Sequence, residues 1–596
     1  TGYPPTTKEG WLKVFRSAKE WGLNHLRFHS WCPPKAAFEV ADSLGFYLQV
    51  ELPLWSLTVG ENPEMNQFLY NEAKRILSEY GNHPSFCFLS LGNELQPDFE
   101  FLGGLLDSVK ALDSRHLYTT TSFTFEKGHG DWPEPHDDFF ITQWTKKGWV
   151  RGQGVFDVEM PNFNKDYSAS VDSMPVPVIT HEIGQYAVYP DLKEIEKYTG
   201  VLEPLNFKGV KQELENKNLL EKADDYLSAS GHLAAILYKE EIERAMKTPG
   251  ISGFQLLDLH DFPGQGTALV GLLNAFWESK GVANAEEFRQ FSAPVVPLAR
   301  FSKAVYKNNE QFTADIEIAN YSSKEINNKN IKWALTNASG QPLQEGIIPL
   351  TNIKIGGGNI AGKISCSLSE VKKAERLTLR VSIENSSYKN TWNIWVYPAT
   401  LTIEKEEIVV TDKLTETQKA LAAGKTVLFN PPYQLCAGLQ GKFVPVFWSP
   451  VHFPKQAGTM GLLLDPTHKA FAHFPTEGHT NWQWWSLTTQ SRTLVIDSIY
   501  QHITPLVECV DNFANNRRLA TLFETNCLNG KLIVCSMDLL NHQDTFPEKK
   551  QLSYSLINYM KSNAFAPVKS ISFEELCSLV KPSSKGKKEE TPQSVY

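Results

Sequence analysis

The sequence lacks several features that would assign it to a well-marked class of protein. Its eight cysteines are scattered without a Cys-x-x-Cys pair, so neither a zinc site nor a disulfide framework is indicated. No apolar run reaches the ~18 residues that a membrane-spanning helix needs. Lys and Arg (58) are fewer than Asp and Glu (67), and no stretch before Lys581 concentrates positive charge, which argues against a nucleic-acid-binding protein.

The length and composition are those of a globular protein with several domains. At 596 residues the chain is too long for one hydrophobic core, and three or four domains are expected. Aromatic residues make up 12% of the chain, and their side chains suit sugar faces as well as large cores. The chain begins with Thr1 and has no signal peptide, which indicates a cut, so the compartment cannot be assigned from this end.

The first half of the chain alternates between helical and strand patterns. Apolar residues at helical spacing lie between short apolar runs, and this alternation predicts parallel strands joined by helices. Seven strands are predicted, one fewer than a (β/α)8 barrel has, and we infer that the first strand lies before Thr1. An open doubly wound sheet is the rival, but no glycine-rich first turn is present. The predicted strands cover residues 24–28, 46–50, 86–91, 117–121, 139–142, 176–180 and 251–257.

The second half predicts two further domains. Residues 294–297 (PVVP) indicate a linker that follows a barrel over residues 1–290. Short alternating runs over 298–398 predict an immunoglobulin-like β-sandwich. Residues 399–570 predict an α/β accessory domain with one parallel sheet, and the run 530–538 (GKLIVCSMD) resembles glutamine-amidotransferase-like domains. Its tryptophans at 482, 484 and 485 could bind glycan or pack against the barrel, and the tail 581–596 is predicted to be disordered.

Two carboxylates stand where predicted strands end. The apolar run Phe86–Leu91 stops at Gly92-Asn93-Glu94, and Glu182 follows a later strand. The carboxyl ends of barrel strands form the active-site face, so both side chains should meet there. Retaining glycosidases use two carboxylates about 5–5.5 Å apart, one as nucleophile and one as acid/base.

Four segments resemble the barrel signatures of glycoside hydrolase family 2, which includes β-galactosidases, β-glucuronidases and β-mannosidases. They are residues 24–34 (NHLRFHSWCPP), 45–51 (GFYLQVE), 82–94 (NHPSFCFLSLGNE) and 177–186 (PVITHEIGQY). The resemblance covers roughly residues 1–290 and makes Glu94 the acid/base and Glu182 the nucleophile. Arg27 matches the position that holds the nucleophile, and Asn93 the position that binds a sugar hydroxyl. Family members carry a jelly roll and a sandwich before the barrel, and this sequence has neither.

Further residues have both a functional and a structural interpretation. Glu51 competes with Glu182 as second carboxylate, and we assign it to the support of Arg27 or of the nucleophile. His29 and Trp31 could contact the sugar or pack in a loop. Trp144 could stack under the sugar or be buried, and Tyr186 could donate to the nucleophile or belong to the core.

The end of the barrel departs from the family pattern. Many members have a Trp within the last strand, whereas this sequence has Gln255 and Leu256, which leaves the floor of the sugar subsite undefined. Asp258 follows that strand, and Trp277 resembles the family's closing segment; both are candidate substrate-binding residues.

The sequence therefore predicts a retaining, exo-acting β-glycosidase of oligosaccharides or polysaccharides, β-galactosidase-like by default, with no metal or other cofactor. Glu94 must be protonated while Glu182 is ionised, and repulsion between them should raise the pKa of Glu94. The alternative is a non-catalytic carbohydrate-binding or scaffold protein derived from such an enzyme. The substrate class suggests a periplasmic or extracellular location, and the oligomeric state is not assigned.

Overall fold

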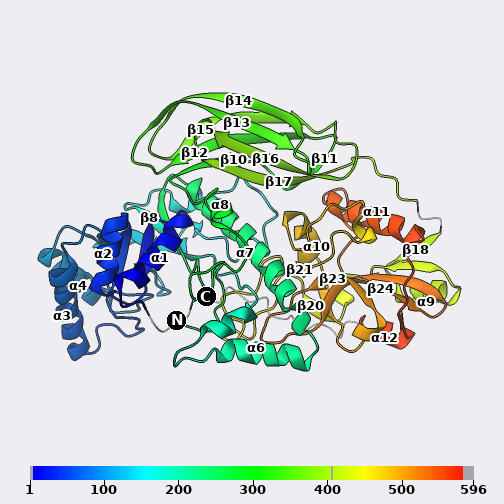
Figure 1. Cartoon of the computed structure of the whole chain (residues 1–596), viewed down its shortest axis with the longest axis horizontal. Coiled ribbons are helices and arrows are strands. Elements are labelled where there is room, and N and C mark those ends of the chain that lie inside the picture. The colour runs from blue at the N-terminus through cyan, green and yellow to red at the C-terminus, as the bar shows by residue number, and fades with distance from the viewer. Residues whose placement is uncertain (1–3, 263, 405–406, 581–596) are drawn as a thin grey trace.

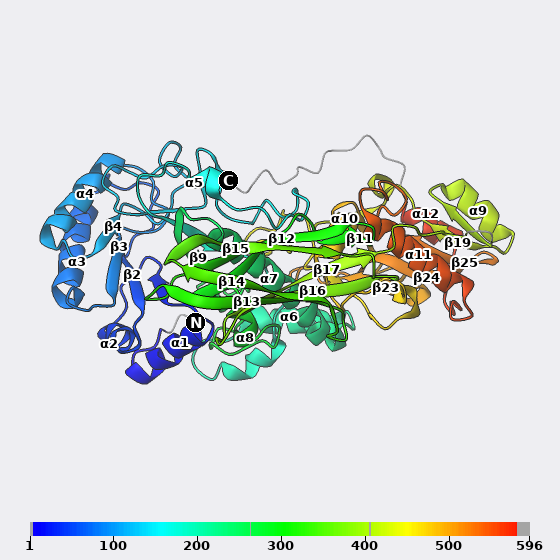
Figure 2. The same cartoon turned by 90° about the horizontal axis from the view of Figure 1, so that it is seen from above.

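The computed structural model describes residues 4–262, 264–404 and 407–580, and the tail for which disorder is predicted lies outside them. Figure 1 shows three lobes: an N-terminal α/β lobe (blue to green), a β-sandwich above it (green) and a C-terminal α/β lobe (yellow to red). Figure 2 shows the long strands of the sandwich extending over helix α7 (Ala223–Met246). None of the described helices is long and apolar enough to cross a membrane.

The seven strands predicted in the N-terminal lobe are all present. They form one parallel sheet of four and a second of three, with the orders β1-β2-β3-β4 and β5-β8-β9. The strands are β1 (His25–Phe28), β2 (Tyr47–Glu51), β3 (Phe86–Ser90), β4 (Leu117–Thr119), β5 (Phe140–Thr142), β8 (Val178–Ile183) and β9 (Ile251–Leu256); β6 (Trp144–Thr145) and β7 (Gly148–Trp149) form a separate hairpin.

The two parallel sheets share one interior. Gln255 of β9 donates to Gln49 of β2 at 2.7 Å, and Phe88 of β3 contacts Phe139, which precedes β5, with ring centroids 5.2 Å apart. Among the described residues, however, neither β4 and β5 nor β9 and β1 pair as strands, so the ring of a barrel is not closed by hydrogen bonds. The barrel thus stays a prediction.

Helices cover these strands, and their ends follow from local sequence. Helix α1 begins after Thr7, whose hydroxyl accepts from the Gly10 N–H, and α3 begins after Asn62, whose side chain accepts from two backbone N–H groups. The four helices between Lys8 and Leu112 each bury one apolar stripe in the core that they share with β1 to β4, whereas α7 is buried on most of its surface. The helices are α1 (Lys8–Glu20), α2 (Lys35–Leu44), α3 (Pro63–Tyr80), α4 (Phe99–Leu112), α5 (Ser168–Val171), α6 (Leu205–Asn216), α7 and α8 (Ala285–Phe288).

The sandwich consists of two sheets, with the orders β10-β12-β15 and β11-β17-β16-β13-β14. The expected linker at 294–297 is wrong, because β10 (Val295–Arg300) pairs with β12 along its whole length. Pro297 fits there since β10 is an edge strand, where a missing N–H can face away from the ladder. The remaining strands are β11 (Val305–Lys307), β12 (Gln311–Asn320), β13 (Ile326–Thr336), β14 (Pro342–Ile353), β15 (Gly356–Ser367), β16 (Glu375–Ile383) and β17 (Lys389–Tyr397).

The sheet of the C-terminal lobe is mixed, so the expectation of one parallel sheet is wrong. β18, β19 and β25 are parallel, but β24 runs antiparallel to β25. The two-residue connection at Leu528 and Asn529 makes them a hairpin, which requires antiparallel strands. The strands are β18 (Ile408–Thr411), β19 (Thr426–Phe429), β20 (Gly438–Gln440), β21 (Leu462–Leu463), β22 (Arg492–Val495), β23 (Thr504–Cys509), β24 (Leu519–Cys527), β25 (Gly530–Cys535) and β26 (Ser570–Ile571); the helices are α9 (Leu414–Ala422), α10 (Trp485–Thr489), α11 (Pro547–Lys561) and α12 (Phe573–Ser578).

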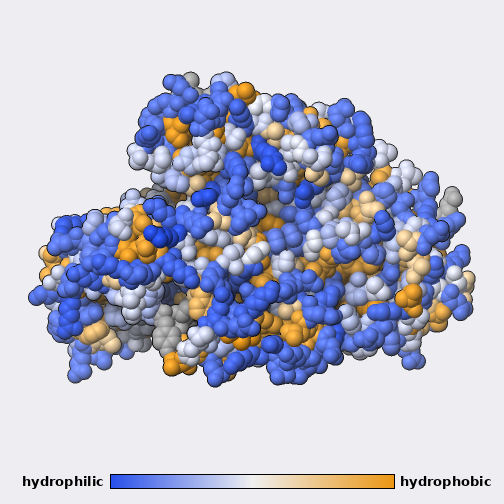
Figure 3. Space-filling view, in the orientation of Figure 1, coloured by the Kyte–Doolittle hydropathy of each residue, from blue (hydrophilic) through white to orange (hydrophobic). Residues whose placement is uncertain are grey.

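The tryptophan cluster of the C-terminal lobe packs against the first lobe. Trp482, Trp484 and Trp485 are buried. The indole N–H of Trp485 donates to the Phe156 carbonyl at 2.7 Å, and Trp482 contacts the ring of Phe156. These contacts agree with the packing interpretation of this cluster. In Figure 3 the visible surface is mostly hydrophilic, and hydrophobic residues gather mainly toward its centre.

A buried charged network joins α7 to the sandwich. The Glu243 carboxylate accepts from the Trp392 indole at 2.9 Å and from Asn390 at 2.8 Å, and it pairs with Lys239. Lys247 lies 3.7 Å from the same carboxylate, and its side chain is fully buried. The Glu243 carboxylate is thus the shared counter-ion of Lys239 and Lys247.

We predict that Glu243→Ala lowers the free energy of unfolding by about 3–5 kcal/mol, because Lys239 and Lys247 would lose a buried counter-ion. Urea unfolding followed by tryptophan fluorescence measures this change. The exposed pair Lys389–Glu286 supplies a matched control, and Glu286→Ala should change stability little. Equal small losses in both variants would show that the network does not stabilise the fold.

Candidate active site

Four charged side chains of the N-terminal lobe meet at the carboxyl ends of parallel strands. Arg27 lies on β1, Glu51 ends β2, Glu182 lies near the end of β8, and Glu94 follows β3. Both Glu94 (φ 51°) and Glu182 (φ 48°) have left-handed backbone conformations, which are uncommon for residues with a side chain and often occur at functional sites.

The Gly92-Asn93-Glu94 turn depends on its glycine. A Cβ atom on Gly92 would lie 2.4 Å from the Leu54 carbonyl oxygen, so no larger residue fits unless the backbone moves. That close approach allows the Asn93 N–H to donate to the same Leu54 oxygen at 3.1 Å. The turn after β3 is thereby tied to the loop after β2.

Arg27 holds three side chains with one guanidinium group. Its Nε donates to Glu51 Oε1 at 2.6 Å, its Nη1 donates to Glu182 Oε1 at 2.7 Å, and its Nη2 donates to Asn93 Oδ1. All of these side chains are buried. The contacts agree with the expected roles of Arg27 as the partner of Glu182 and of Glu51 as a support of Arg27, whereas the Asn93 oxygen is already taken by Arg27.

Glu94 and Glu182 lie close enough to act on one bond. One oxygen of each carboxylate and one nitrogen of His181 all lie within 4.8 Å of one another. Such a group could hold a metal ion by spacing alone. However, Arg27 already places a positive charge on Glu182, and the two His181 nitrogens lie near Gln143 and Asn93, so these residues fit a carboxylate pair better than a cation site.

The two carboxyl groups have opposite pKa shifts. Burial, followed by the negative charge of Glu182, raises the pKa of Glu94 to about 7. Burial also opposes ionisation of Glu182, but the nearby His181 and Arg27 outweigh it and lower the pKa of Glu182 to about 2. Burial lowers the pKa of His181 well below its usual value, so Arg27 is the permanent positive charge. Near neutral pH Glu182 is therefore ionised, and Glu94 is close to its midpoint.

A cavity of about 520 Å³ lies beside Arg27, between β1 and β9, and its lining in the described chain includes none of Glu51, Glu94 and Glu182. His260 stacks on Trp277 with ring centroids 4.2 Å apart and lies 3.0 Å from the Asp258 carboxylate. The cavity brings together these predicted substrate-binding residues: Arg27, His29, Trp31, Asp258 and Trp277.

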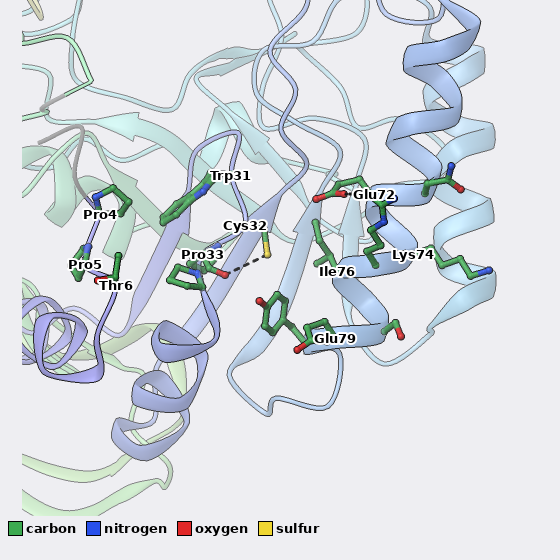
Figure 4. Close-up of a pocket in the computed structure, with 15 residues that line it drawn as sticks. Pro4, Pro5, Thr6, Trp31, Cys32, Pro33, Glu72, Lys74, Ile76 and Glu79 are labelled. Atoms are coloured by element: carbon green, nitrogen blue, oxygen red, sulfur yellow. Dashed lines mark hydrogen bonds and ion pairs between the residues drawn. The ribbon is translucent and has the colours of Figure 1, made fainter.

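Trp31 also borders a second hollow of about 1080 Å³, between Pro4–Thr6 and helix α3 (Figure 4). Its indole stacks on Trp11 with ring centroids 6.3 Å apart and meets the ring of Phe28 edge-on. This agrees with the packing interpretation of Trp31, while one side of the residue still lines the cavity near Arg27.

The last two predicted residues, Trp144 and Tyr186, do not line the cavity beside Arg27. Trp144 on β6 packs against Phe123, whose ring is 5.4 Å from that of His181. The Tyr186 hydroxyl donates to Glu241 of α7 at 2.8 Å, so Glu182 is not its acceptor. Tyr186 is buried, in agreement with its interpretation as a core residue.

Two contacts of the site have no signal in the sequence. The indole N–H of Trp55 donates to Glu94 Oε2 at 3.3 Å, and His181 lies beside Glu182 with a nitrogen 3.4 Å from Oε1. Trp55 lies in the loop after β2, where no periodicity fixes its direction. His181 is adjacent to Glu182 in sequence, and strand alternation alone would place it on the opposite face.

Comparison with known proteins gives two domain matches and several distant structural likenesses. Two domains of unknown function match: DUF8488 over residues 310–398 and DUF8487 over residues 409–581. No curated protein matches.

Solved structures that resemble this chain include several glycosidases. The β-D-mannosidase of Dictyoglomus thermophilum has a TM-score of 0.47 and 15% identity, over 68% of this chain and 50% of its own. The exo-chitosanase of Amycolatopsis orientalis has a TM-score of 0.42 and 13% identity, over 67% of this chain and 48% of its own. The β-glucuronidase 3 of Bacteroides uniformis has a TM-score of 0.35 and 15% identity, over 68% of this chain and 49% of its own. This chain spans about half the length of each. Because these scores and identities are low, the function proposed below depends on the geometry of the carboxylates.

We predict that Arg27→Met raises the pKa of Glu182 by about 1–3 units, because the carboxylate would lose its charged partner while it stays buried. A pH titration of the ¹³C-labelled glutamate carboxyl groups by NMR measures this shift, with a Glu182→Gln spectrum to assign the resonance. Arg75→Met, which removes an exposed ion pair with Glu72, is the control and should leave the Glu182 titration unchanged. An unchanged titration in Arg27→Met would mean that Arg27 does not set this pKa.

Proposed function

We propose that the protein is a retaining β-glycosidase in which Glu182 is the nucleophile and Glu94 the acid/base. The observation that supports this most is the close approach of two carboxyl groups with opposite pKa shifts at the ends of parallel strands. A retaining glycosidase needs two carboxyl groups about 5–5.5 Å apart, one ionised and one protonated. The resemblance of four sequence segments to glycoside hydrolase family 2 points to the same pair.

In the first step, a Glu182 oxygen attacks the anomeric carbon while the glycosidic C–O bond breaks. Glu94 gives its proton to the leaving oxygen, so the departing group leaves as an alcohol. Arg27 already binds Glu182 Oε1, which leaves Oε2 as the attacking atom. In the second step, Glu94 takes a proton from water, the water oxygen attacks the same carbon, and the bond to Glu182 breaks.

We also propose that the seven parallel strands belong to a (β/α)8 barrel in which the eighth strand lies between β9 and β1. The parallel direction, the order of the strands and their shared interior support this arrangement. A non-catalytic carbohydrate-binding protein is the second candidate function. The observation that favours it is the lining of the cavity beside Arg27, which includes Trp31 and Trp277 but neither Glu94 nor Glu182.

The identity of the sugar is tested with a panel of aryl β-glycosides, with β-galactoside as the default member. Turnover of one member supports the enzyme. Binding of a sugar, measured by calorimetry, without turnover of any member supports the non-catalytic protein instead.

We predict that Glu182→Gly abolishes hydrolysis and that azide restores a reaction. Azide can occupy the space of the missing carboxylate and attack the anomeric carbon directly, giving a glycosyl azide of inverted configuration. Product analysis by NMR identifies the anomer. Glu51→Gln is a useful comparison, since Glu51 supports Arg27 and does not attack, so azide should not rescue it. Hydrolysis that survives in Glu182→Gly would exclude Glu182 as nucleophile.

We predict that kcat/KM falls as the pH rises above about 7. Glu94 is active as an acid only when protonated, and its folded pKa is about 7, so each further pH unit should lower the rate about tenfold. The loss of ionised Glu182 lies near pH 2 and should not limit the rate between pH 4 and 6. In Glu94→Gln, measured with an aryl glycoside whose leaving group needs no proton, this basic limb should disappear. A limb that persists there belongs to another group.

A further inference from the structure

Trp55 has an exposed indole, although burial normally stabilises so large an aromatic side chain. Of the described tryptophans, it alone belongs to the largely exposed hydrophobic residues, with 58% of its surface accessible. An indole that stays in water forgoes the stabilisation of burial, and exposed aromatic residues are enriched at binding sites. The exposed ring also touches Glu94, because its N–H donates to Oε2 at 3.3 Å.

The loop that carries Trp55 is held firmly on both sides of the indole. The Leu54 carbonyl accepts from Asn93 N at 3.1 Å and from the Ser30 hydroxyl at 3.0 Å. On the other side, the Ser56 carbonyl accepts from Gln96 N at 3.0 Å. Trp55 is therefore attached through its neighbours to the turn that bears Glu94. A platform that is preorganised in this way loses little freedom when a ligand binds.

We propose that Trp55 forms the leaving-group subsite, where its exposed indole face stacks on the ring that departs from the sugar. This inference rests on the proposed function. If Glu94 protonates the leaving oxygen, the group beyond that oxygen must lie beside Glu94, and Trp55 is the exposed aromatic residue in contact with it. The ligand class is a flat ring with an apolar face, either a pyranose or an aryl group. Arg27, in contrast, bonds to the other carboxylate, Glu182.

The indole N–H has a second effect on the same step. Glu94 becomes a carboxylate when it transfers its proton to the leaving oxygen, and a hydrogen bond from Trp55 stabilises that charged form. The N–H bond and the stacking face are separable by substitution. Trp55→Phe removes the N–H and keeps an aromatic face, whereas Trp55→Ala removes both.

The test compares two leaving groups on the sugar that the wild-type protein hydrolyses best. One substrate is the methyl β-glycoside, which has no ring to stack, and the other is the β-linked disaccharide. We expect Trp55→Ala to lower kcat/KM for the disaccharide about threefold to tenfold more than for the methyl glycoside, mainly through KM. Trp55→Phe should keep most of this preference, but the basic limb of its pH profile should move upward. Tyr47→Ala is the matched control, because Tyr47 is 51% exposed at the opposite end of β2. This substitution should change neither the ratio of kcat/KM for the two substrates nor the basic limb of the pH profile.

The outcomes test the stacking role of Trp55, the role of its N–H and the proposed function separately. Equal losses for the two substrates in Trp55→Ala, with thermal stability unchanged, would overturn the stacking role. An unshifted basic limb in Trp55→Phe would overturn the role of the N–H. If the wild-type protein hydrolyses none of the glycosides, the proposed function fails, and the subsite that rests on it fails with it. Hydrolysis in the wild type with no selective effect at Trp55 overturns only the subsite.

Discussion

The site depends on one guanidinium group with three acceptors. Arg27 binds Glu51, Glu182 and Asn93, which come from three separate strands or turns, so a single side chain from β1 sets the positions of groups on β2, β3 and β8. Burying three polar groups without such a partner would be strongly unfavourable. Because the planar guanidinium fixes the directions of its donors, it positions the carboxylates as well as neutralising them. Lysine could supply the charge but not this geometry.

The Arg27 guanidinium group also makes the pKa values of the two carboxyl groups differ. Arg27 contacts Glu182 directly and does not bond to Glu94, so its charge favours ionisation of one far more than of the other. Once Glu182 is ionised, its negative charge and the burial of Glu94 keep the second proton in place. Two identical side chains thus acquire different protonation states from one asymmetrically placed cation. The Trp55 N–H and the charge of Arg27 act in the opposite sense on Glu94, so the pKa of Glu94 is a balance of burial and the Glu182 charge against these two interactions.

Sequence patterns predicted the parts of the fold that local chemistry determines. The seven strands of the N-terminal lobe were predicted because short runs rich in apolar residues alternate with helical patterns, and Glu94 and Glu182 were found because they follow such runs. The same reasoning failed at residues 295–300, where proline suggested a linker although an edge strand tolerates it. It also failed for β24, whose direction depends on a two-residue turn that periodicity does not register. Trp55 was missed because its contact with Glu94 joins two loops that lie far apart in sequence.

The segment after Glu182 is held by contacts with both α7 and the C-terminal lobe. Gly184 closely approaches Tyr238 of α7, since a Cβ there would lie 2.0 Å from the ring, and its N–H donates to Glu241. Immediately afterwards the chain is bound by the C-terminal lobe: Ala187 N donates to the Val446 carbonyl at 3.1 Å, and Trp448 N donates to the Gln185 carbonyl at 3.0 Å. The left-handed backbone at Glu182 is thus followed by a segment held on two sides. Such external support can maintain a conformation that a residue with a side chain seldom adopts, and here α7 and the C-terminal lobe both provide it.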